Sequence, residues 1–133
     1  VGIIAIVINN SNKKEKIEQE EKQEEYVDRL EDGTRLNKSD KLHESKTIDG
    51  LTISNLQLTE KENVTVLLGT ITNNTEETKG GYPVDIKIID KEGNEIITVG
   101  GYIGEIKPGE SMQLNSSATF DYANAYDFEI TKK

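Results

Sequence analysis

The fold is decided by residues 64–111, which read VTVLLGTITNNTEETKGGYPVDIKIIDKEGNEIITVGGYIGEIKPGES. Short runs of Val, Ile and Leu alternate there with polar residues, and clusters of Asn, Gly and Pro interrupt them at 73–75, 90–94 and 107–110. Strands of this length with such turn residues between them are typical of an antiparallel β-sandwich or barrel. Because this kind of scaffold carries many unrelated functions, the fold class alone does not define a function.

The same pattern extends over residues 49–133 and predicts one small domain. The turn at 90–93 is expected to be a type I turn whose glycine takes the left-handed conformation, and the Pro-Gly pair at 108–109 fits the centre of a type II turn. Asn55 is expected to mark a bulge in the first strand. We therefore predict an all-β fold, a small Ig-like antiparallel β-sandwich of six or seven strands. The expected strands cover residues 51–58, 64–72, 84–88, 96–99, 112–118 and 126–130.

Charge and composition exclude several functional classes. The chain has 133 residues, of which 33% are apolar and 31% are charged, and its formal net charge is −9. Residues 1–48 contribute −2 (11 acids, 9 bases) and residues 49–133 contribute −7 (14 acids, 7 bases). An acidic module repels phosphate backbones, so we expect no nucleic-acid binding. The chain has no cysteine, which rules out disulfides, thiolate metal sites and a cysteine nucleophile within it.

Residues 1–8, VGIIAIVI, are wholly apolar, and the run stops at the polar residues 9–12. Eight residues rise only about 12 Å as a helix, whereas a bilayer core needs about 20 residues. We interpret the run as the end of a membrane anchor or signal segment that begins upstream. A buried β-strand is the alternative, because Val and Ile favour strands. The first interpretation predicts a single-pass protein of the cell membrane with an extracytoplasmic domain, or a secreted protein if the segment is cleaved.

Residues 9–48 are polar nearly throughout and are expected to form a stalk or linker. Good helix formers without proline fill residues 13–32, and two Glu-to-base pairs lie four positions apart in the favourable order. Gly33 then predicts an end to the helix. Because so few apolar residues cannot bury a core, we predict a solvated helix that is frayed or disordered after Gly33 and adds little to stability.

Four stretches of the predicted sandwich carry a family resemblance. Residues 68–74 (LGTITNN) end a strand with a G-x-I-x-N pattern, and residues 86–90 (IKIID) precede a glycine turn. Residues 106–111 (IKPGES) make a Pro-Gly-Glu corner, and Phe120 and residues 125–128 follow it. These stretches resemble FxLYD domains, bacterial cell-envelope modules with G-x-V-x-N, Phe-x-Leu-Tyr-Asp and L-x-P-G-E motifs. In the second motif only the aspartate is kept, and three isoleucines replace Phe, Leu and Tyr. The resemblance implies an Ig-like sandwich, commonly behind a signal peptide or a single membrane helix.

Residues for catalysis or metal binding are sparse. The only histidine, His43, lies in the predicted linker, where a mobile base cannot be positioned, so we expect no nucleophilic catalysis and no enzyme activity. The turn at 90–95 (DKEGNE) weakly resembles a calcium loop but lacks the dense Asp series and the closing Glu, so neither a metal nor a cofactor is expected. Paired carboxylates are a candidate for glycoside chemistry, although a solvated acidic face is the simpler interpretation. These carboxylates are Asp85, Glu105, Asp121, Asp127 and Glu129.

The tripeptide Gly-Gly-Tyr occurs twice, at residues 80–82 and 100–102. The two copies flank the predicted hairpin around Glu92, so we expect them to lie near each other at its open end. Exposed tyrosines are good contact residues, and paired glycines allow close backbone approach. Tyr82 and Tyr102 are therefore our candidate interaction patch. The alternative is that both rings pack against the end of the sandwich.

These observations favour a non-catalytic module. We expect a membrane-tethered extracytoplasmic interaction or structural module that contacts the membrane only through its N-terminal segment. Its partner is expected to be a protein or a cell-wall component. The alternative is an envelope domain that senses a ligand or an ion, and an enzyme is the least favoured of the three.

Overall fold

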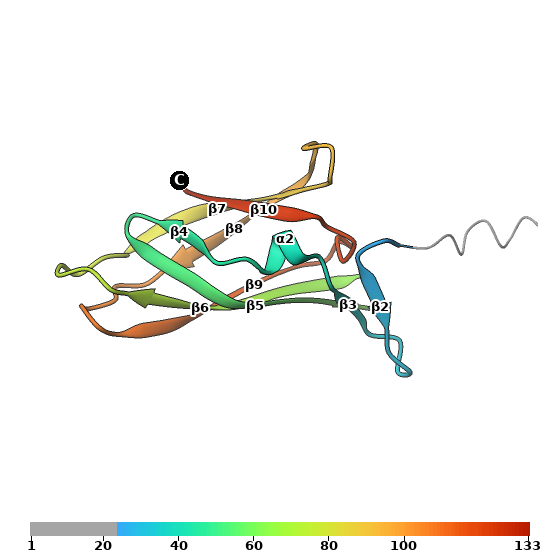
Figure 1. Ribbon diagram of the computed structural model, residues 1–133, viewed down its shortest axis with the longest axis horizontal. Coiled ribbons are helices and arrows are strands. Elements are labelled where there is room, and N and C mark those ends of the chain that lie inside the picture. Colours follow the sequence, from blue (N-terminus) through green and yellow to red (C-terminus); the bar gives the residue numbers. More distant parts are fainter. Residues whose placement is uncertain (1–23) are drawn as a thin grey trace, which may run out of the picture.

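The computed structural model describes residues 24–133, which fold into two antiparallel β-sheets stacked as a sandwich (Figure 1). The larger sheet has six strands and the smaller has three. This architecture confirms the predicted all-β fold class. The alternation of apolar and polar residues explains it, because each strand places one row of side chains between the sheets and the other row in solvent.

The six-stranded sheet has the order β2-β3-β5-β6-β9, and β4 pairs with β5 along the edge that β3 also uses. Its strands are β2 (Val27–Arg29), β3 (Arg35–Asn37), β4 (Lys46–Ile48), β5 (Leu51–Lys61), β6 (Val64–Asn73) and β9 (Ser111–Ala118). The three-stranded sheet has the order β10-β7-β8. Its strands are β7 (Tyr82–Ile89), β8 (Glu95–Ile103) and β10 (Asp127–Lys132). The short helix α2 (Asp40–His43) connects β3 to β4.

Six of these strands, β5 to β10, are the ones that the sequence predicts. The geometry expected for two turn glycines is also confirmed. Gly93 has a φ of 89°, and its N–H donates to Asp90 O at 3.0 Å to close the β7–β8 turn. Gly109 has a φ of 83°, and the next residue, Glu110, donates its N–H to Lys107 O at 3.0 Å. Both glycines hold a left-handed backbone that most other residues adopt only with strain.

A bulge in β5 shifts its core-facing row of side chains. The register of β5 against β6 changes between Ser54 and Gln57, so Asn55 and Leu56 together face Gly69. Asn55 has a φ of 52°, and the alternation of buried residues changes phase beside it, which confirms the predicted bulge. Glycine suits the position opposite the bulge, because a Cβ on Gly69 would lie 2.9 Å from Leu56 Cδ2 and 3.3 Å from Ser54 O, and Leu56 would have to shift.

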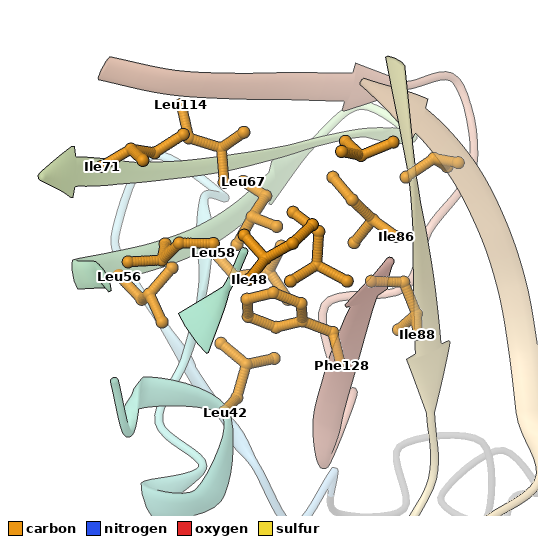
Figure 2. Packing of buried hydrophobic residues seen from close by; sticks show 14 of the residues in the cluster. Leu42, Ile48, Leu56, Leu58, Leu67, Ile71, Ile86, Ile88, Leu114 and Phe128 are labelled. Carbon is orange, nitrogen blue, oxygen red and sulfur yellow. The ribbon is translucent and has the colours of Figure 1, made fainter. Parts of the chain in front are cut away.

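The hydrophobic core lies between the two sheets, as Figure 2 shows. Leu67 and Ile71 of the larger sheet are fully buried there. Ile86 and Ile88 of β7, together with Phe128 of β10, fill the core from the smaller sheet. A side chain of this size contributes about 1.5–3 kcal/mol when it is fully buried. Burial of these rows holds the sheets together without a disulfide, since the chain has no cysteine.

Residues 24–48 belong to the sandwich, so the prediction of a solvated stalk is wrong for them. β2, β3 and β4 all join the six-stranded sheet. The N-cap Ser39 accepts the N–H of Leu42, and α2 places the Leu42 side chain in the core with no exposed surface (Figure 2). Three-residue strands are too short to show a period of two, which is why the sequence pattern missed them. The remaining part of the predicted stalk, residues 9–23, and the apolar run at 1–8 lie outside the described residues.

Candidate functional site

Tyr82, one of the two tyrosines of the predicted patch, is half-buried at the start of β7. Its hydroxyl donates a hydrogen bond to Asp49 Oδ2 at 3.0 Å, and Lys132 Nζ lies 4.4 Å from the centre of its ring. Burial and the hydrogen bond to the Asp49 carboxylate raise the pKa of Tyr82 to about 12. Lys79 Nζ lies 3.6 Å from the other oxygen of that carboxylate. Tyr82 is thus engaged in contacts within its own chain.

Tyr102 lies on the neighbouring strand β8 and is 60% exposed. The register pairs Tyr82 with Ile103 and Pro83 with Tyr102. Directly paired residues point to the same face of a sheet, and consecutive residues point to opposite faces. Because Ile103 is buried in the core, Tyr82 points to the core side and Tyr102 to the solvent side. The structure therefore does not bring the two rings onto one surface, and the expected two-tyrosine patch is not formed.

The two glycine pairs of the repeat have different structural causes. Gly80 has a φ of 92°, and a Cβ on it would lie 2.1 Å from Gly104 O, so the position tolerates only glycine. Gly101 faces the core, where a Cβ would meet Val84 Cγ2 at 3.3 Å. A Cβ on Gly100 would meet no atom within 4 Å. Backbone approach and core packing account for Gly80 and Gly101, so the repeat does not by itself mark a binding loop.

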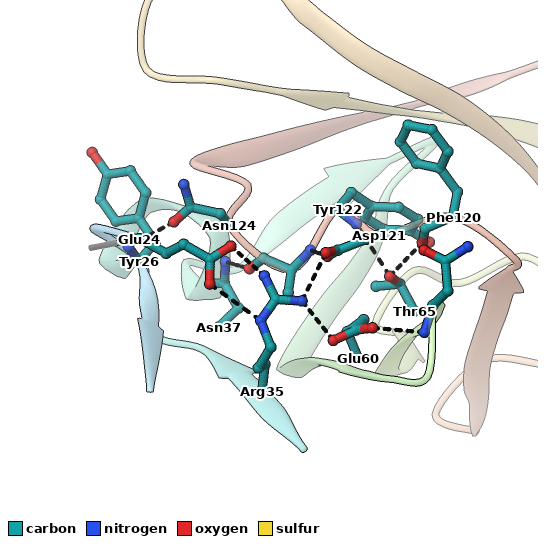
Figure 3. A network of polar contacts seen from close by, with 12 residues as sticks. Glu24, Tyr26, Arg35, Asn37, Glu60, Thr65, Phe120, Asp121, Tyr122 and Asn124 are labelled. Carbon is teal, nitrogen blue, oxygen red and sulfur yellow. Dashed lines mark hydrogen bonds and ion pairs between the residues drawn. The ribbon is translucent and has the colours of Figure 1, made fainter. Parts of the chain in front are cut away.

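The buried guanidinium of Arg35, on β3, gathers three carboxylates (Figure 3). Its Nη1 atom lies 2.6 Å from Glu60 Oε1 on β5 and 2.8 Å from Asp121 Oδ2 in the loop before β10. Glu24 binds another side of the guanidinium with both carboxylate oxygens, one of them 3.1 Å from Arg35 Nε. We call these four residues the Arg35 clamp. The clamp joins Glu24, which precedes β2, to the strands β3 and β5 and to the loop before β10.

Further hydrogen bonds complete the Arg35 clamp. Burial alone would disfavour the charged guanidinium, but the hydrogen bonds to the three carboxylates outweigh it and raise the pKa of Arg35 above its usual range. The second oxygen of Glu60 accepts the N–H of Asn63 at 2.7 Å, and that of Asp121 accepts the N–H of Ala123 at 3.1 Å. Buried charges are stable when they are paired and hydrogen-bonded in this way. The clamp therefore fastens chain segments together.

Sequence reasoning missed the clamp because it assigned Arg35 to a solvated linker. The partners of Arg35 lie 11, 25 and 86 positions away along the chain. Arg35, Asn37 and Ser39 are buried at alternate positions, but all three are polar, so they give no contrast in hydropathy. Asn37 is tied to the same distant loop, since its Nδ2 donates to Ala123 O at 2.7 Å and to Ala125 O at 2.8 Å.

Asn73, at the end of β6, organises two loops at the other end of the sandwich (Figure 1). Its Nδ2 donates to Glu77 O at 2.8 Å and to Ile106 O at 2.7 Å. Its Oδ1 accepts the N–H and the hydroxyl of Thr75 at 2.8 and 2.7 Å, and its own N–H donates to Glu110 O. Asn73 is fully buried and ends the G-x-I-x-N pattern. This motif residue therefore has a structural task.

Most of the carboxylates considered for glycoside chemistry take part in ion pairs. Glu105 lies exposed in the loop between β8 and β9. The ion pairs are Asp127 with Lys46 at 2.9 Å, Glu129 with Lys87 at 3.6 Å, Asp85 with Lys133 at 3.5 Å and Asp121 with Arg35 at 2.8 Å.

His43, which was expected in a mobile linker, instead ends α2, and its Nδ1 atom lies 2.7 Å from Ser39 O.

The turn considered as a calcium loop uses its first carboxylate internally. Asp90 Oδ1 accepts the N–H groups of Glu92 at 3.0 Å and Asn94 at 2.9 Å. Such bonds stabilise a tight turn and occupy an oxygen that an ion would need. Within residues 24–133, no three His, Cys, Asp or Glu side chains are grouped so that they could hold a metal ion. In that same range, no helix has the length and apolar character needed to cross a bilayer.

Comparison of the chain with protein-family models, with curated proteins and with solved structures finds no match in any of the three. The resemblance to FxLYD domains therefore remains a prediction from the motifs. The fold class itself, an all-β sandwich of two antiparallel sheets, comes from the structure.

Proposed function

We propose that this chain is a non-catalytic extracytoplasmic module of the FxLYD type, with a structural or interaction role, tethered to the membrane through its N-terminal segment. The apolar run at residues 1–8 supports the tether. The motif resemblance supports a cell-envelope location. Gly69 and Asn73 keep the spacing of the family pattern, and their tasks at the β5 bulge and at the loops support the family assignment.

The Arg35 clamp is the observation that carries this proposal. Glu24 lies before the first strand of the sandwich, and Arg35 binds it while also holding β5 through Glu60 and the loop before β10 through Asp121. A pull on the chain before Glu24 is therefore transmitted to several parts of the sandwich at once. Separating a buried ion pair is costly, because each partner would be left with an uncompensated charge. A joint of this kind suits a domain that is anchored at its N-terminal side.

The remaining polar groups support a structural role over a catalytic one. Nucleophilic catalysis needs a nucleophile and a base within hydrogen-bond reach of each other, with a third group to orient the base. His43 instead contacts a backbone carbonyl of its own helix turn. Asp127 and Glu129 face Lys46 and Lys87 in ion pairs between neighbouring elements. Groups committed in this way stabilise the fold.

Site-specific labelling in intact cells tests the location. The 133 residues contain no cysteine, so Glu92→Cys places a single thiol among them, in the exposed β7–β8 turn. The variant is made in the full-length protein. A membrane-impermeant maleimide is expected to label this variant in intact cells, and the protein is expected to stay in the membrane pellet after an alkaline carbonate wash. The lysed-cell sample is the control for thiol reactivity. Labelling that requires lysis would contradict the extracytoplasmic location.

A further inference from the structure

One side of the sandwich carries two strands that end their sheets. β9 ends the six-stranded sheet, β8 ends the three-stranded sheet, and the two strands contact each other. The edge formed by β10 is covered by α2 and β4, where Lys46 Nζ lies 2.9 Å from Asp127 Oδ1 and Ser39 Oγ donates to Tyr126 O. The remaining edge, β2, is only three residues long. Long uncovered edge strands invite pairing with a further strand.

These two strands also carry almost no charge. Residues 96–104 and 111–120 contain no Asp, Glu, Lys or Arg, although 31% of the whole chain is charged. Natural proteins usually protect an edge strand with a charge, a proline or a bulge. β9 has none of these, since it reads SMQLNSSA and its register against β6 is unbroken. The edge of β9 is therefore unprotected against pairing.

Backbone geometry shows that β9 is the more open of the two edges. At the centre of β8, Gly100 O accepts a hydrogen bond from Ser116 Oγ at 3.3 Å, so β9 itself partly closes the β8 edge. Among residues 24–133, β9 pairs only with β6. Asn73 of β6 donates its N–H to Glu110 O. Because successive residues of a strand point their backbone groups to opposite sides, those of Glu110 and of every second residue after it point toward β6. The residues between them, whose backbone groups point away from the sheet, are Ser111, Gln113, Asn115 and Ser117.

We propose that a second copy of this chain pairs with the first along β9, in antiparallel orientation, so that the six-stranded sheets of two molecules form one continuous sheet. A two-fold axis perpendicular to the sheet places Asn115 opposite its own copy and Gln113 opposite Ser117. These three side chains are uncharged and exposed, so they can hydrogen-bond across the pair. The same symmetry keeps both cores on one face and brings the uncharged β8 edges toward each other. The inference concerns the sandwich itself and goes beyond the location proposed above.

The distribution of charge favours a second copy in this orientation. Each copy carries a net charge of −9, so two copies repel each other where their acidic surfaces meet. Along β9 and β8 they can approach without that cost. Antiparallel pairing brings Glu110 of one copy near Phe120 of the other, whereas parallel pairing would set two Glu110 side chains side by side. Phe120 is 43% exposed in a single chain, and the antiparallel partner would cover it.

The first test compares two lysine variants of the 133-residue chain. Asn115→Lys sets two like charges opposite each other at the centre of the pair, which is unfavourable. Gln57→Lys is the matched control, because Gln57, Leu68 and Asn115 form one cross-strand row and Gln57 lies two strands inward, about 10 Å from the edge. Sedimentation velocity is expected to show a dimer for the wild type and for Gln57→Lys, and a monomer for Asn115→Lys. A monomeric wild type, or a dimer that survives Asn115→Lys, overturns the proposal.

The second test does not depend on a charged substitution. The chain has no cysteine, so Asn115→Cys introduces one thiol at the symmetry point, and Gln57→Cys is its control. Directly paired antiparallel residues have Cα atoms about 5.5 Å apart, which lies within the range of a disulfide. Mild oxidation is expected to convert the Asn115→Cys variant into a covalent dimer and to leave Gln57→Cys monomeric on a denaturing gel. Equal cross-linking of both variants, or none of the first, rules out pairing along β9.

Discussion

Arg35 on β3 and Glu60 on β5 face each other as direct partners of two antiparallel strands, with Arg35 Nη1 2.6 Å from Glu60 Oε1. Only 9% and 8% of their side chains are exposed. A pair this buried persists because the remaining polar atoms are satisfied, here by Glu24, by Asp121 and by the N–H of Asn63. The pair also fixes the register of β3, since a slip of one residue would turn Arg35 to the other face of the sheet.

Removing the guanidinium is expected to destabilise the fold strongly. Arg35→Ala leaves Glu60 buried without a counter-charge, and breaking a fully buried pair costs about 3–5 kcal/mol. Glu24 and Asp121 are 33% and 39% exposed, so we expect the lower end, about 3 kcal/mol, in urea denaturation. Arg29→Ala is the control, because Arg29 is exposed on β2, and it should change stability by no more than about 0.5 kcal/mol. Similar losses for both variants would argue against the clamp.

Leu42 tests whether the segment before β4 belongs to the core. Leu42→Ala removes a fully buried side chain and leaves a cavity, so a loss of about 2–5 kcal/mol in the free energy of unfolding is expected. Leu30→Ala makes the same chemical change at a side chain that is 46% exposed, and it should cost far less. Thermal and urea melts of the two variants measure the difference. An unchanged melt for Leu42→Ala would restore the stalk prediction.

The raised pKa of Tyr82 predicts a dependence of stability on alkaline pH. A group whose pKa is higher in the folded state contributes stability that is present below its unfolded pKa, about 10 for tyrosine, and is lost as pH rises through the folded value. For Tyr82 that window runs from about pH 10 to about pH 12. Tyrosinate absorbance is titrated for the wild type and for Tyr82→Phe, and subtracting the second curve from the first isolates the titration of Tyr82. The midpoint of this difference curve should lie near pH 12. A midpoint close to pH 10 would mean that the bond to Asp49 does not form.

Asn73 is expected to hold the two loops that it bonds. Asn73→Ala removes four side-chain hydrogen bonds and leaves buried groups unpaired, which costs about 1–3 kcal/mol for each unsatisfied group. Hydrogen exchange should then speed up at residues 74–78 and 105–110, with little change in β7. Asn74→Ala, at the exposed neighbouring position, is the matched control. Faster exchange across the whole sandwich would show instead that the effect is global unfolding.

Calcium is expected to leave the 90–95 turn unaffected. Asp90 Oδ1 already accepts two backbone N–H groups, and extracellular sites with few oxygen ligands bind calcium only at about 10⁻⁴–10⁻³ M. Calorimetry with millimolar calcium should give no saturable heat and no rise in melting temperature. Saturable heat that Asp90→Asn abolishes would favour the ion-sensing alternative.

Local patterns were enough to predict β5 to β10, the β5 bulge at Asn55 and the turns at Gly93 and Gly109. Each of these depends on neighbours in the chain. A strand of six or more residues shows its period of two, and a turn glycine is recognised from the residues beside it. The same locality explains the error at Tyr82 and Tyr102. Two nearby tyrosines suggested one patch, whereas the register of β7 against β8 decides which face each ring occupies.

Contacts between distant parts of the chain decided everything else. Whether Arg35 is solvated or buried depends on Glu60 and Asp121, which lie 25 and 86 positions away, and no local pattern encodes such a meeting. Leu42 likewise becomes a core residue only because β4 and α2 fold back on the sheets. The openness of the β9 edge is set by the order of strands in the sheet. Burial and pairing are properties of surfaces that the folded chain brings together, so a polar segment can be part of a core without any hydropathy signal.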